Sequence, residues 1–259
     1  MSRVALFVTC VGDLVDPDVP AAAVRVLRAC GATVTVPEGQ TCCGQPAWNA
    51  GFADDAATVA RTSLDALEAA LDGDADGADA DGELTIVVPA GSCAAMIRMY
   101  WPTLFDTVGD AEAAARSRRV GERVLELTEW VAGHADALPP MAAPRAVAVA
   151  YHRSCHMLRE LHVVEQPTEL LDRVAGCEVA AWSTDDRCCG FGGTFSVKLP
   201  EVSAAMADEK LDSLPDGVIE IVGADASCLL QLRTRAQHRG LAVTTRHIAQ
   251  VLDEAIGPT

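Results

Sequence analysis

Residues 37–47 read PEGQTCCGQPA and residues 186–195 read DRCCGFGGTF, so a Cys-Cys-Gly triplet occurs once in each half of the chain. Each triplet has one distant cysteine before it and one after it. The pattern uses eight of the ten cysteines: Cys10, Cys42, Cys43 and Cys93 in the first half, and Cys155, Cys188, Cys189 and Cys228 in the second. Between the first cysteine and the pair lie 31 residues in the first half and 32 in the second. Four thiols brought together twice are typical of metal or iron–sulfur sites.

The bulk composition restricts the class of protein. At 259 residues and 50% hydrophobic content, the chain can build one large domain or two modest ones with a proper core. A net charge of −17 disfavours nucleic acid as a partner, because a phosphate backbone requires clustered Lys and Arg. No apolar run reaches the roughly 18 residues of a membrane span, and the N-terminus lacks a signal-peptide cleavage site. We predict a cytoplasmic protein, whose thiols stay reduced and serve as ligands or catalysts.

The predicted elements follow the same order in both halves. The first half is predicted to contain strands at 4–10, 33–37 and 84–89, and helices at 17–29, 53–71 and 91–101. The second is predicted to contain strands at 146–151, 178–182 and 218–223, helices at 164–174 and 201–214, and a helix that opens at 227–228. A final strand and helix, at 241–245 and 248–256, resemble 123–131. Alternating strands and helices predict an α/β fold class with two pseudo-symmetric halves, each a small parallel sheet flanked by helices with a cysteine site at its loop edge.

Two segments mark the organisation of the chain. Residues 72–83, DGDADGADADGE, cannot build a core, and we predict a surface insertion here rather than a calcium loop. Without these 12 residues, 37 residues separate Cys43 from Cys93, close to the 38 between Cys189 and Cys228. The proline-rich stretch 138–144 is predicted to be the domain boundary. We therefore expect one cysteine-rich α/β domain over 1–138 and another over 145–259.

The position of the thiols within this fold explains why they converge. Loops at the carboxyl edge of a parallel sheet face one crevice. Two adjacent cysteines cannot bind one group from a regular helix or strand, so each pair requires a tight loop. The glycines that follow, Gly44 and Gly190, permit unusual backbone angles and the close approach of a cluster. Cys93 and Cys228 are expected to open helices, whose free N–H groups stabilise a thiolate.

Two cysteines lie outside the repeat. Cys30 and Cys177 sit beside turn glycines ahead of strands, and they fit small buried hydrophobic residues. The matching spacing in both halves argues against that interpretation for the other eight, and a reducing cytosol argues against disulfides.

Five stretches of the chain carry a family resemblance. They are FVTC at 7–10, PEGQTCCGQPA at 37–47, GSCAAM at 91–96, YHRSCHMLR at 151–159 and CCGFGGTF at 188–195. They resemble the cysteine-rich CCG family, which includes the B subunit of heterodisulfide reductase and the iron–sulfur subunit of glycolate oxidase. The resemblance implies an iron–sulfur electron-transfer subunit that oxidises L-lactate to pyruvate together with two partner subunits, at least one of them also an iron–sulfur protein. Spacing and composition do not distinguish lactate from other 2-hydroxy acids.

The chain departs from the wider family at one place in each half. Heterodisulfide-reductase members end each motif with Cys-x-x-Cys, whereas Ala90 and Asp225 replace the first of those cysteines here. Four thiolates per half suffice for one ordinary four-iron cluster, 4Fe-4S, in each half. The missing cysteines count against the alternative of a thiol or heterodisulfide reductase. A second alternative is a structural zinc protein with four thiolates, or zinc in one of the two sites. Asp225 is either an oxygen ligand or a capping or surface residue.

The residues around the second motif differ from those around the first. His152 and His156 flank Cys155, and we expect them to form hydrogen bonds to cluster sulfurs rather than to act as ligands or acids. Arg153 and Arg187 add positive charge there. Because nearby cations favour the reduced cluster, we expect the second cluster to have the higher reduction potential. The sequence assigns no catalytic residue.

Overall fold

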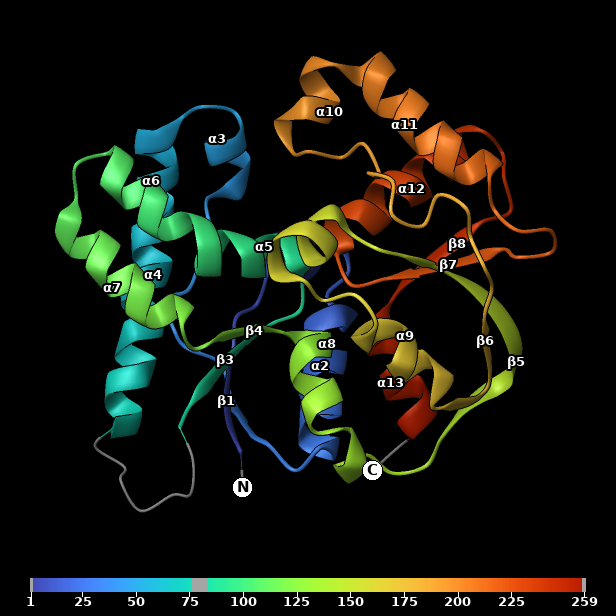
Figure 1. Cartoon of the computed structure of the whole chain (residues 1–259), viewed down its shortest axis with the longest axis horizontal. Coiled ribbons are helices and arrows are strands. Elements are labelled where there is room, and N and C mark those ends of the chain that lie inside the picture. The colour runs from blue at the N-terminus through green and yellow to red at the C-terminus, as the bar shows by residue number, and fades with distance from the viewer. Residues whose placement is uncertain (1, 76–82, 258–259) are drawn as a thin grey trace.

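Two four-stranded sheets, one from each half of the chain, organise the molecule (Figure 1). The computed structural model describes residues 2–75 and 83–257. The strand orders are β2-β1-β3-β4 and β6-β5-β7-β8, and all the pairs are parallel. The strands are β1 (Arg3–Leu6), β2 (Thr33–Thr35), β3 (Thr85–Val88), β4 (Val124–Glu126), β5 (Met141–His152), β6 (Val174–Val179), β7 (Glu220–Gly223) and β8 (Thr244–His247). The predicted α/β class, with one parallel sheet in each half, is confirmed.

Helices connect these strands in both halves. The first half contains α1 (Cys10–Val15), α2 (Asp18–Ala29), α3 (Gln45–Asn49), α4 (Ala53–Ala75), α5 (Gly91–Ala95), η1 (Met96–Tyr100), α6 (Trp101–Thr107), α7 (Ala111–Gly121), α8 (Leu127–Gly133) and η2 (Ala135–Ala137). The second contains η3 (Met157–Leu161), α9 (Gln166–Asp172), α10 (Thr194–Lys198), α11 (Pro200–Asp212), α12 (Ala226–His238) and α13 (Ile248–Ile256). The two sheets have the same strand order in sequence, which is the pseudo-symmetry that the cysteine spacing predicts.

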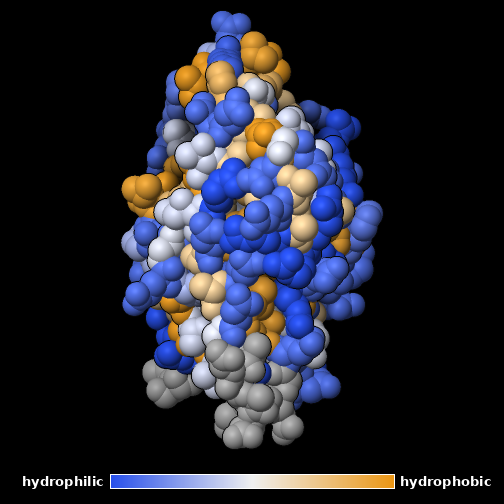
Figure 2. Space-filling model, turned by 90° about the vertical axis from the view of Figure 1, so that its left-hand side faces the viewer, coloured by the Kyte–Doolittle hydropathy of each residue, from blue (hydrophilic) through white to orange (hydrophobic). Residues whose placement is uncertain are grey.

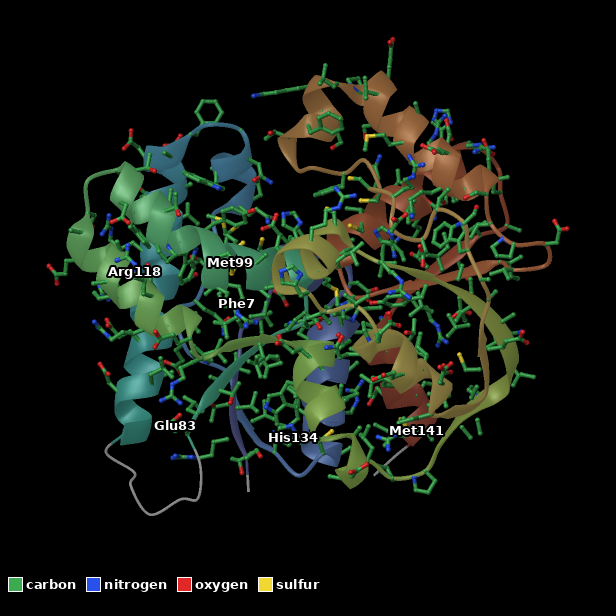
Figure 3. The ribbon with its side chains drawn as sticks, in the orientation of Figure 1. Phe7, Glu83, Met99, Arg118, His134 and Met141 are labelled. Carbon is green, nitrogen blue, oxygen red and sulfur yellow. The ribbon has the colours of Figure 1, made fainter. Side chains whose placement is uncertain are left out.

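The core runs through both halves. Helix α2 packs against α13 and helix α8 against α9, so that these four helices lie between the two sheets (Figure 1). Phe7, just after β1, lies at the end of the first sheet and is fully buried (Figure 3). One continuous cluster of buried apolar side chains contains residues of both sheets. The division into domains at 1–138 and 145–259 stays a prediction; β5 already begins at Met141.

The outer helices present their polar sides to solvent. Figure 2 shows the face formed by α4, α6 and α7 as mostly hydrophilic, with apolar side chains scattered over it. Within the part of the chain that the structure describes, no helix combines the length and the apolar character needed to cross a bilayer.

Strand β1 ends earlier than the predicted 4–10, and Cys10 begins helix α1. The Gln40 side chain accepts a hydrogen bond from Val8 N at 2.7 Å and donates one to Leu6 O at 3.2 Å. A side chain therefore takes the place of a neighbouring strand at this point. The chain is then free to turn, and Cys10 lies at a helix start rather than at a strand end.

Other helices and strands also begin or end at residues that differ from the prediction. Strand β6 begins at Val174 instead of 178, because the long β5 already offers Met141 as a pairing partner. Helix α4 extends to Ala75, so residues 72–75 of the predicted insertion are helical. Residues 76–82 of that insertion lie outside the described residues. The helix predicted over 91–101 contains a π-helical turn, η1, between α5 and α6.

Glu126, at the end of β4, generates a test of the core. It is fully buried at the N-cap of α8, where its side chain accepts a hydrogen bond from Thr128 N at 2.6 Å. Burial raises the pKa of Glu126 to about 8. Between these two pKa values the folded state keeps a proton on Glu126 that the unfolded state releases. The stabilisation from this proton is complete below the ordinary pKa of 4.5, and it is lost as the pH rises toward 8.

We expect Glu126→Gln to flatten the pH dependence of the free energy of unfolding between about pH 5 and 8. Denaturant unfolding at a series of pH values measures this slope. Glu122→Gln, at an exposed position, is the control and should keep the parent slope. An unchanged slope in Glu126→Gln would contradict this account of the buried carboxyl group.

Candidate metal centre

The eight cysteines of the repeated pattern come together at one place. All of them line a single pocket of about 770 Å³, a volume that includes its open mouth. Neither Cys30 nor Cys177 is among the residues that line it. In each half, two of the four thiols are buried and two are half-buried: Cys43, Cys93, Cys189 and Cys228 are buried, whereas Cys10, Cys42, Cys155 and Cys188 are half-buried. The two quartets are therefore alike in exposure and face a common space.

The first quartet is drawn from three separate elements. Cys10 is the first residue of α1, Cys93 lies in the first turn of α5, and the Cys42–Cys43 pair lies in the loop between β2 and α3. The Sγ atoms of Cys10 and Cys42 are 3.5 Å apart, and those of Cys43 and Cys93 are 3.3 Å apart. The four sulfur atoms thus form two close pairs that line the same pocket.

The second quartet repeats the arrangement. Cys155 lies two residues before η3, Cys228 lies in the first turn of α12, and the Cys188–Cys189 pair lies in the loop that precedes α10. A hydrogen bond from Cys155 is the main factor that lowers the pKa of Cys188, to about 2. In the first quartet the hydrogen bond from Cys10 lowers the pKa of Cys42 to about 3. Each quartet thus stabilises a thiolate at the same position, the first cysteine of its pair.

The glycine after each pair has two structural roles. Gly44 N donates to Cys42 Sγ and Gly190 N donates to Cys188 Sγ, each at 3.4 Å. Both glycines have a left-handed backbone, with φ of +85°. A Cβ atom at Gly44 would lie 2.7 Å from the carbonyl oxygen of Ala56, and one at Gly190 would lie 2.5 Å from that of Ser203. The backbone angle is as the sequence predicted, and the structure adds a close approach of the backbone of the next long helix, α4 or α11. The close approach of a cluster stays a prediction.

Polar contacts of Gln45 and His156 connect the two quartets. Gln45 Nε2 donates to Ser92 O at 2.9 Å and lies 3.2 Å from His156 Nε2. His156 Nδ1 in turn lies 3.6 Å from Cys155 Sγ. His156 therefore lies beside a sulfur atom of the second quartet, and the same ring also reaches the loop of the other half. Its role in tuning a cluster stays a prediction.

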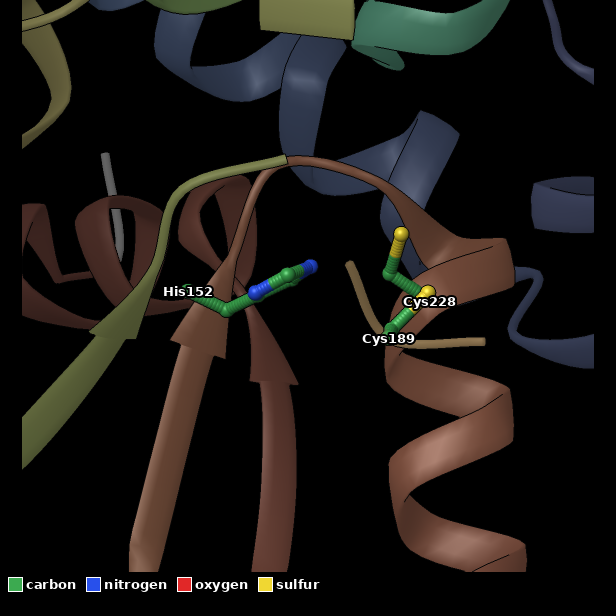
Figure 4. A group of neighbouring side chains, drawn as sticks. All are labelled: His152, Cys189 and Cys228. Carbon is green, nitrogen blue, oxygen red and sulfur yellow. The ribbon is translucent and has the colours of Figure 1, made fainter. Parts of the chain in front are cut away.

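His152 has a different environment. Its ring points from the end of β5 toward Cys189 and Cys228 (Figure 4), and a ring nitrogen and the two sulfur atoms lie within 4.8 Å of one another. Both ring nitrogens are buried and have no hydrogen-bond partner among the described residues. Burial lowers the pKa of His152 to about 3, so the imidazole is neutral. A neutral ring aimed at two thiols can either donate to a sulfur atom or bind a metal.

Asp225 is a buried helix cap and not a surface residue. Its carboxylate accepts hydrogen bonds from Ser227 N at 3.1 Å and from Ser92 N at 2.9 Å. Of the alternatives that the sequence left open, the structure shows the capping role. Ala90, at the corresponding place in the first half, is the N-cap residue of α5.

Sequence reasoning missed Lys210, which is fully buried in α11. Its Nζ atom lies 4.2 Å from the centroid of the Trp182 ring and donates to Asp185 O at 3.2 Å. Burial lowers the pKa of Lys210 to about 8, while the nearby Cys189 and Cys228 act in the opposite direction. The signal was present, because Lys210 follows Ser203 and Ala207 on the buried face of its helix.

The first half has no cation at the corresponding place in the described chain. If Gly44 and Gly190 are superposed through their contacts with Ala56 O and Ser203 O, then Ser63 matches Lys210. Ser63 is buried and accepts a hydrogen bond from Thr41 N at 2.9 Å. The asymmetry of charge between the two quartets is therefore built into the core.

The arginines that the sequence singled out are engaged elsewhere. Arg153 pairs with Asp185 at 3.0 Å, and Arg187, whose side chain is 62% exposed, lies 3.7 Å from Glu209. Solvent and these carboxylates screen both charges. The buried ammonium of Lys210 is the stronger source of positive potential at the second quartet.

Comparison with known proteins places this site in a family. The model of the cysteine-rich domain family called CCG matches the chain twice, at residues 4–98 and 149–233. The two matches contain the two quartets that the structure assembles.

Full-length relatives agree with that match. Lactate utilization protein A of Exiguobacterium sp. (strain ATCC BAA-1283 / AT1b) is 39% identical over 257 residues, 99% of each chain. The protein of that name from Geobacillus kaustophilus is 39% identical and covers 97% of this chain and 98% of its own length. Lactate utilization protein A 2 of Bacillus cereus (strain 03BB102) is 34% identical, with 98% and 99% covered. The chain therefore belongs to the cysteine-rich CCG family, and the full-length relatives named here are lactate utilization A proteins.

The close approach of Gly44 to α4 generates a stability test. Gly39 also has a left-handed backbone, with φ of +82°, but a Cβ atom there would meet nothing within 4 Å. We expect Gly39→Ala to cost about 1 kcal/mol for the backbone angle alone. Gly44→Ala should lower the free energy of unfolding by clearly more, because the methyl group must also displace the Ala56 carbonyl. Denaturant unfolding compares the two, and equal losses would show that the contact with α4 is unimportant.

Proposed function

We propose that each cysteine quartet holds one iron–sulfur cluster, and that the chain carries electrons in a complex that oxidises L-lactate or a related 2-hydroxy acid. The ligands are Cys10, Cys42, Cys43 and Cys93 for one cluster, and Cys155, Cys188, Cys189 and Cys228 for the other. The strongest support is that eight thiols, four from each half of the chain, line the same pocket. The names of the relatives support the substrate class.

The donor set fits an iron–sulfur cluster. Four cysteine thiolates are the usual ligands of a four-iron cluster, which supplies one-electron transfer when it is bound. The glycine N–H groups that point at Cys42 and Cys188 favour ionised sulfur. Four thiolates also fit zinc, which has no redox activity. Metal analysis separates the two, as described below.

The lining of the pocket supports electron transfer over substrate binding. A 2-hydroxy acid is an anion at neutral pH, and a Lys or Arg side chain is a common partner of a carboxylate. None of the described residues that line the pocket is Lys or Arg, and Asp225 adds a carboxylate to the eight thiols. We therefore place the oxidation of the hydroxy acid on a partner subunit. Two further subunits, at least one of them an iron–sulfur protein, complete the proposed complex.

The alternative of a heterodisulfide-reductase-type activity has less support. Its fifth cysteine is replaced by Ala90 in one half and by Asp225 in the other. The Asp225 carboxylate is already occupied by donors from Ser92 and Ser227. Neither site therefore offers a fifth protein sulfur in the family's position.

Iron and acid-labile sulfide in anaerobically purified protein test the proposal. We expect about eight of each per chain, four for each quartet. Cys43→Ser and Cys189→Ser should each remove about half of the iron, whereas Cys177→Ser, outside the pocket, should remove none. Zinc without sulfide would contradict the proposal, and so would loss of all the iron in either single variant.

Lys210 generates a further test, because a buried cation stabilises the more negative, reduced form of a cluster. At pH 7, Lys210→Met should lower the midpoint potential of the cluster held by the second quartet and leave the first unchanged. Arg187→Met removes an exposed cation and is the control, for which we expect a much smaller shift. Redox titration followed by EPR measures both. An unchanged or raised potential in Lys210→Met would contradict this role.

A further inference from the structure

One carboxylate links the two halves of the pocket. Asp225 is the N-cap of α12, and its side chain accepts hydrogen bonds from Ser227 N at 3.1 Å and from Ser227 Oγ. Its other oxygen, Oδ2, accepts the backbone N–H of Ser92 at 2.9 Å. Ser92 belongs to α5 of the first half, so Asp225 binds the start of the helix that carries Cys93 as well as the start of the helix that carries Cys228.

The first half does not provide such a cap. Ala90, its N-cap residue, has no side-chain oxygen, and no capping hydrogen bond from it is present. Because the first N–H groups of a helix require an acceptor, a carboxylate from the other half supplies it. The start of α5 also packs closely against the second half at this point, because a Cβ atom at Gly91 would lie 2.2 Å from Cγ of Met157 in η3.

The charge of this carboxylate is buried and retained. Asp225 is 2% exposed and lines the pocket together with the eight thiols. Burial acts to raise the pKa of Asp225, but the hydrogen bonds from Ser227 and Ser92 outweigh burial and lower it below the ordinary value. Away from solvent, such a charge is weakly screened.

We propose that Asp225 is a shared positioning residue: it fixes the two cysteine-bearing helices to each other and places one negative charge between the two clusters, which lowers both of their reduction potentials together. This inference rests on the proposed function, since it concerns clusters at both quartets. It gives the chain one residue whose replacement moves two redox centres in the same direction. Lys210, in contrast, lies beside the second quartet alone.

Three variants of the full chain, purified anaerobically, test this proposal. Asp225→Asn keeps the shape of the side chain but removes the charge. Ser227→Ala keeps the charge but removes one of its donors. Asp110→Asn is the matched control: Asp110 also caps a helix, accepting from Ala113 N at 2.9 Å, but it does not line the pocket. Iron content is measured first. Midpoint potentials follow by EPR-monitored titration, with signals assigned through Cys43→Ser and Cys189→Ser.

We expect Asp225→Asn to raise both midpoint potentials and Asp110→Asn to change neither. Ser227→Ala should leave both unchanged or lower them, because a carboxylate with fewer donors is a stronger negative charge. If Ser227→Ala instead raised both, general loosening of the pocket would explain the shift and the proposal would fail. It would also fail if Asp225→Asn bound iron and moved one potential only, or neither.

Two further outcomes keep the tests separate. A parent protein without iron would contradict the proposed function. Thermal unfolding would then test the capping role of Asp225, and Asp225→Asn must lose more stability than Asp110→Asn. Should Asp225→Asn alone fail to bind iron, Asp225→Glu, which keeps the charge, must bind iron with potentials close to those of the parent. Loss of iron in that variant too would overturn the electrostatic part of the proposal.

Discussion

In both halves, the glycine of the Cys-Cys-Gly loop lies against the backbone of the long helix that follows. A Cβ atom at Gly44 would overlap the Ala56 carbonyl and one at Gly190 that of Ser203, and both glycines have a left-handed backbone that other residues rarely adopt. This contact fixes the loop, and the loop directs two adjacent thiols into one pocket. Neither a regular helix nor a strand could do so. The remaining ligands then need only a helix start on each side, which the parallel α/β topology provides at the same edge of the sheet.

The two sites are similar in their thiols and different in their surroundings. Each quartet has two buried and two half-buried sulfur atoms, and each stabilises a thiolate at the first cysteine of its pair. Around them, the core of the second half holds Lys210 where the first has Ser63, and it supplies Asp225 to the helix starts of both halves. The duplication thus provides two equivalent ligand sets, and a few buried charges distinguish them.

Much of this could be predicted from the sequence because it depends on local patterns. The alternation of strands and helices predicted the two parallel sheets, and the apolar periodicity of 248–256 predicted the bounds of α13 without error. What the sequence could not show depends on contacts between distant segments. Strand β1 ends early because Gln40, more than 30 residues away, binds its last residues. The sharing of one pocket by both quartets, and the reach of Asp225 to Ser92, depend on how the two sheets pack.

We propose that the two quartets hold two separate iron-containing groups in one pocket. Anomalous X-ray diffraction at the iron absorption edge, from crystals grown anaerobically, can locate these groups. We expect two distinct iron peaks, one against the sulfur atoms of Cys10, Cys42, Cys43 and Cys93, and one against those of Cys155, Cys188, Cys189 and Cys228. A single peak shared by all eight sulfur atoms, or a signal at the zinc edge alone, would contradict it.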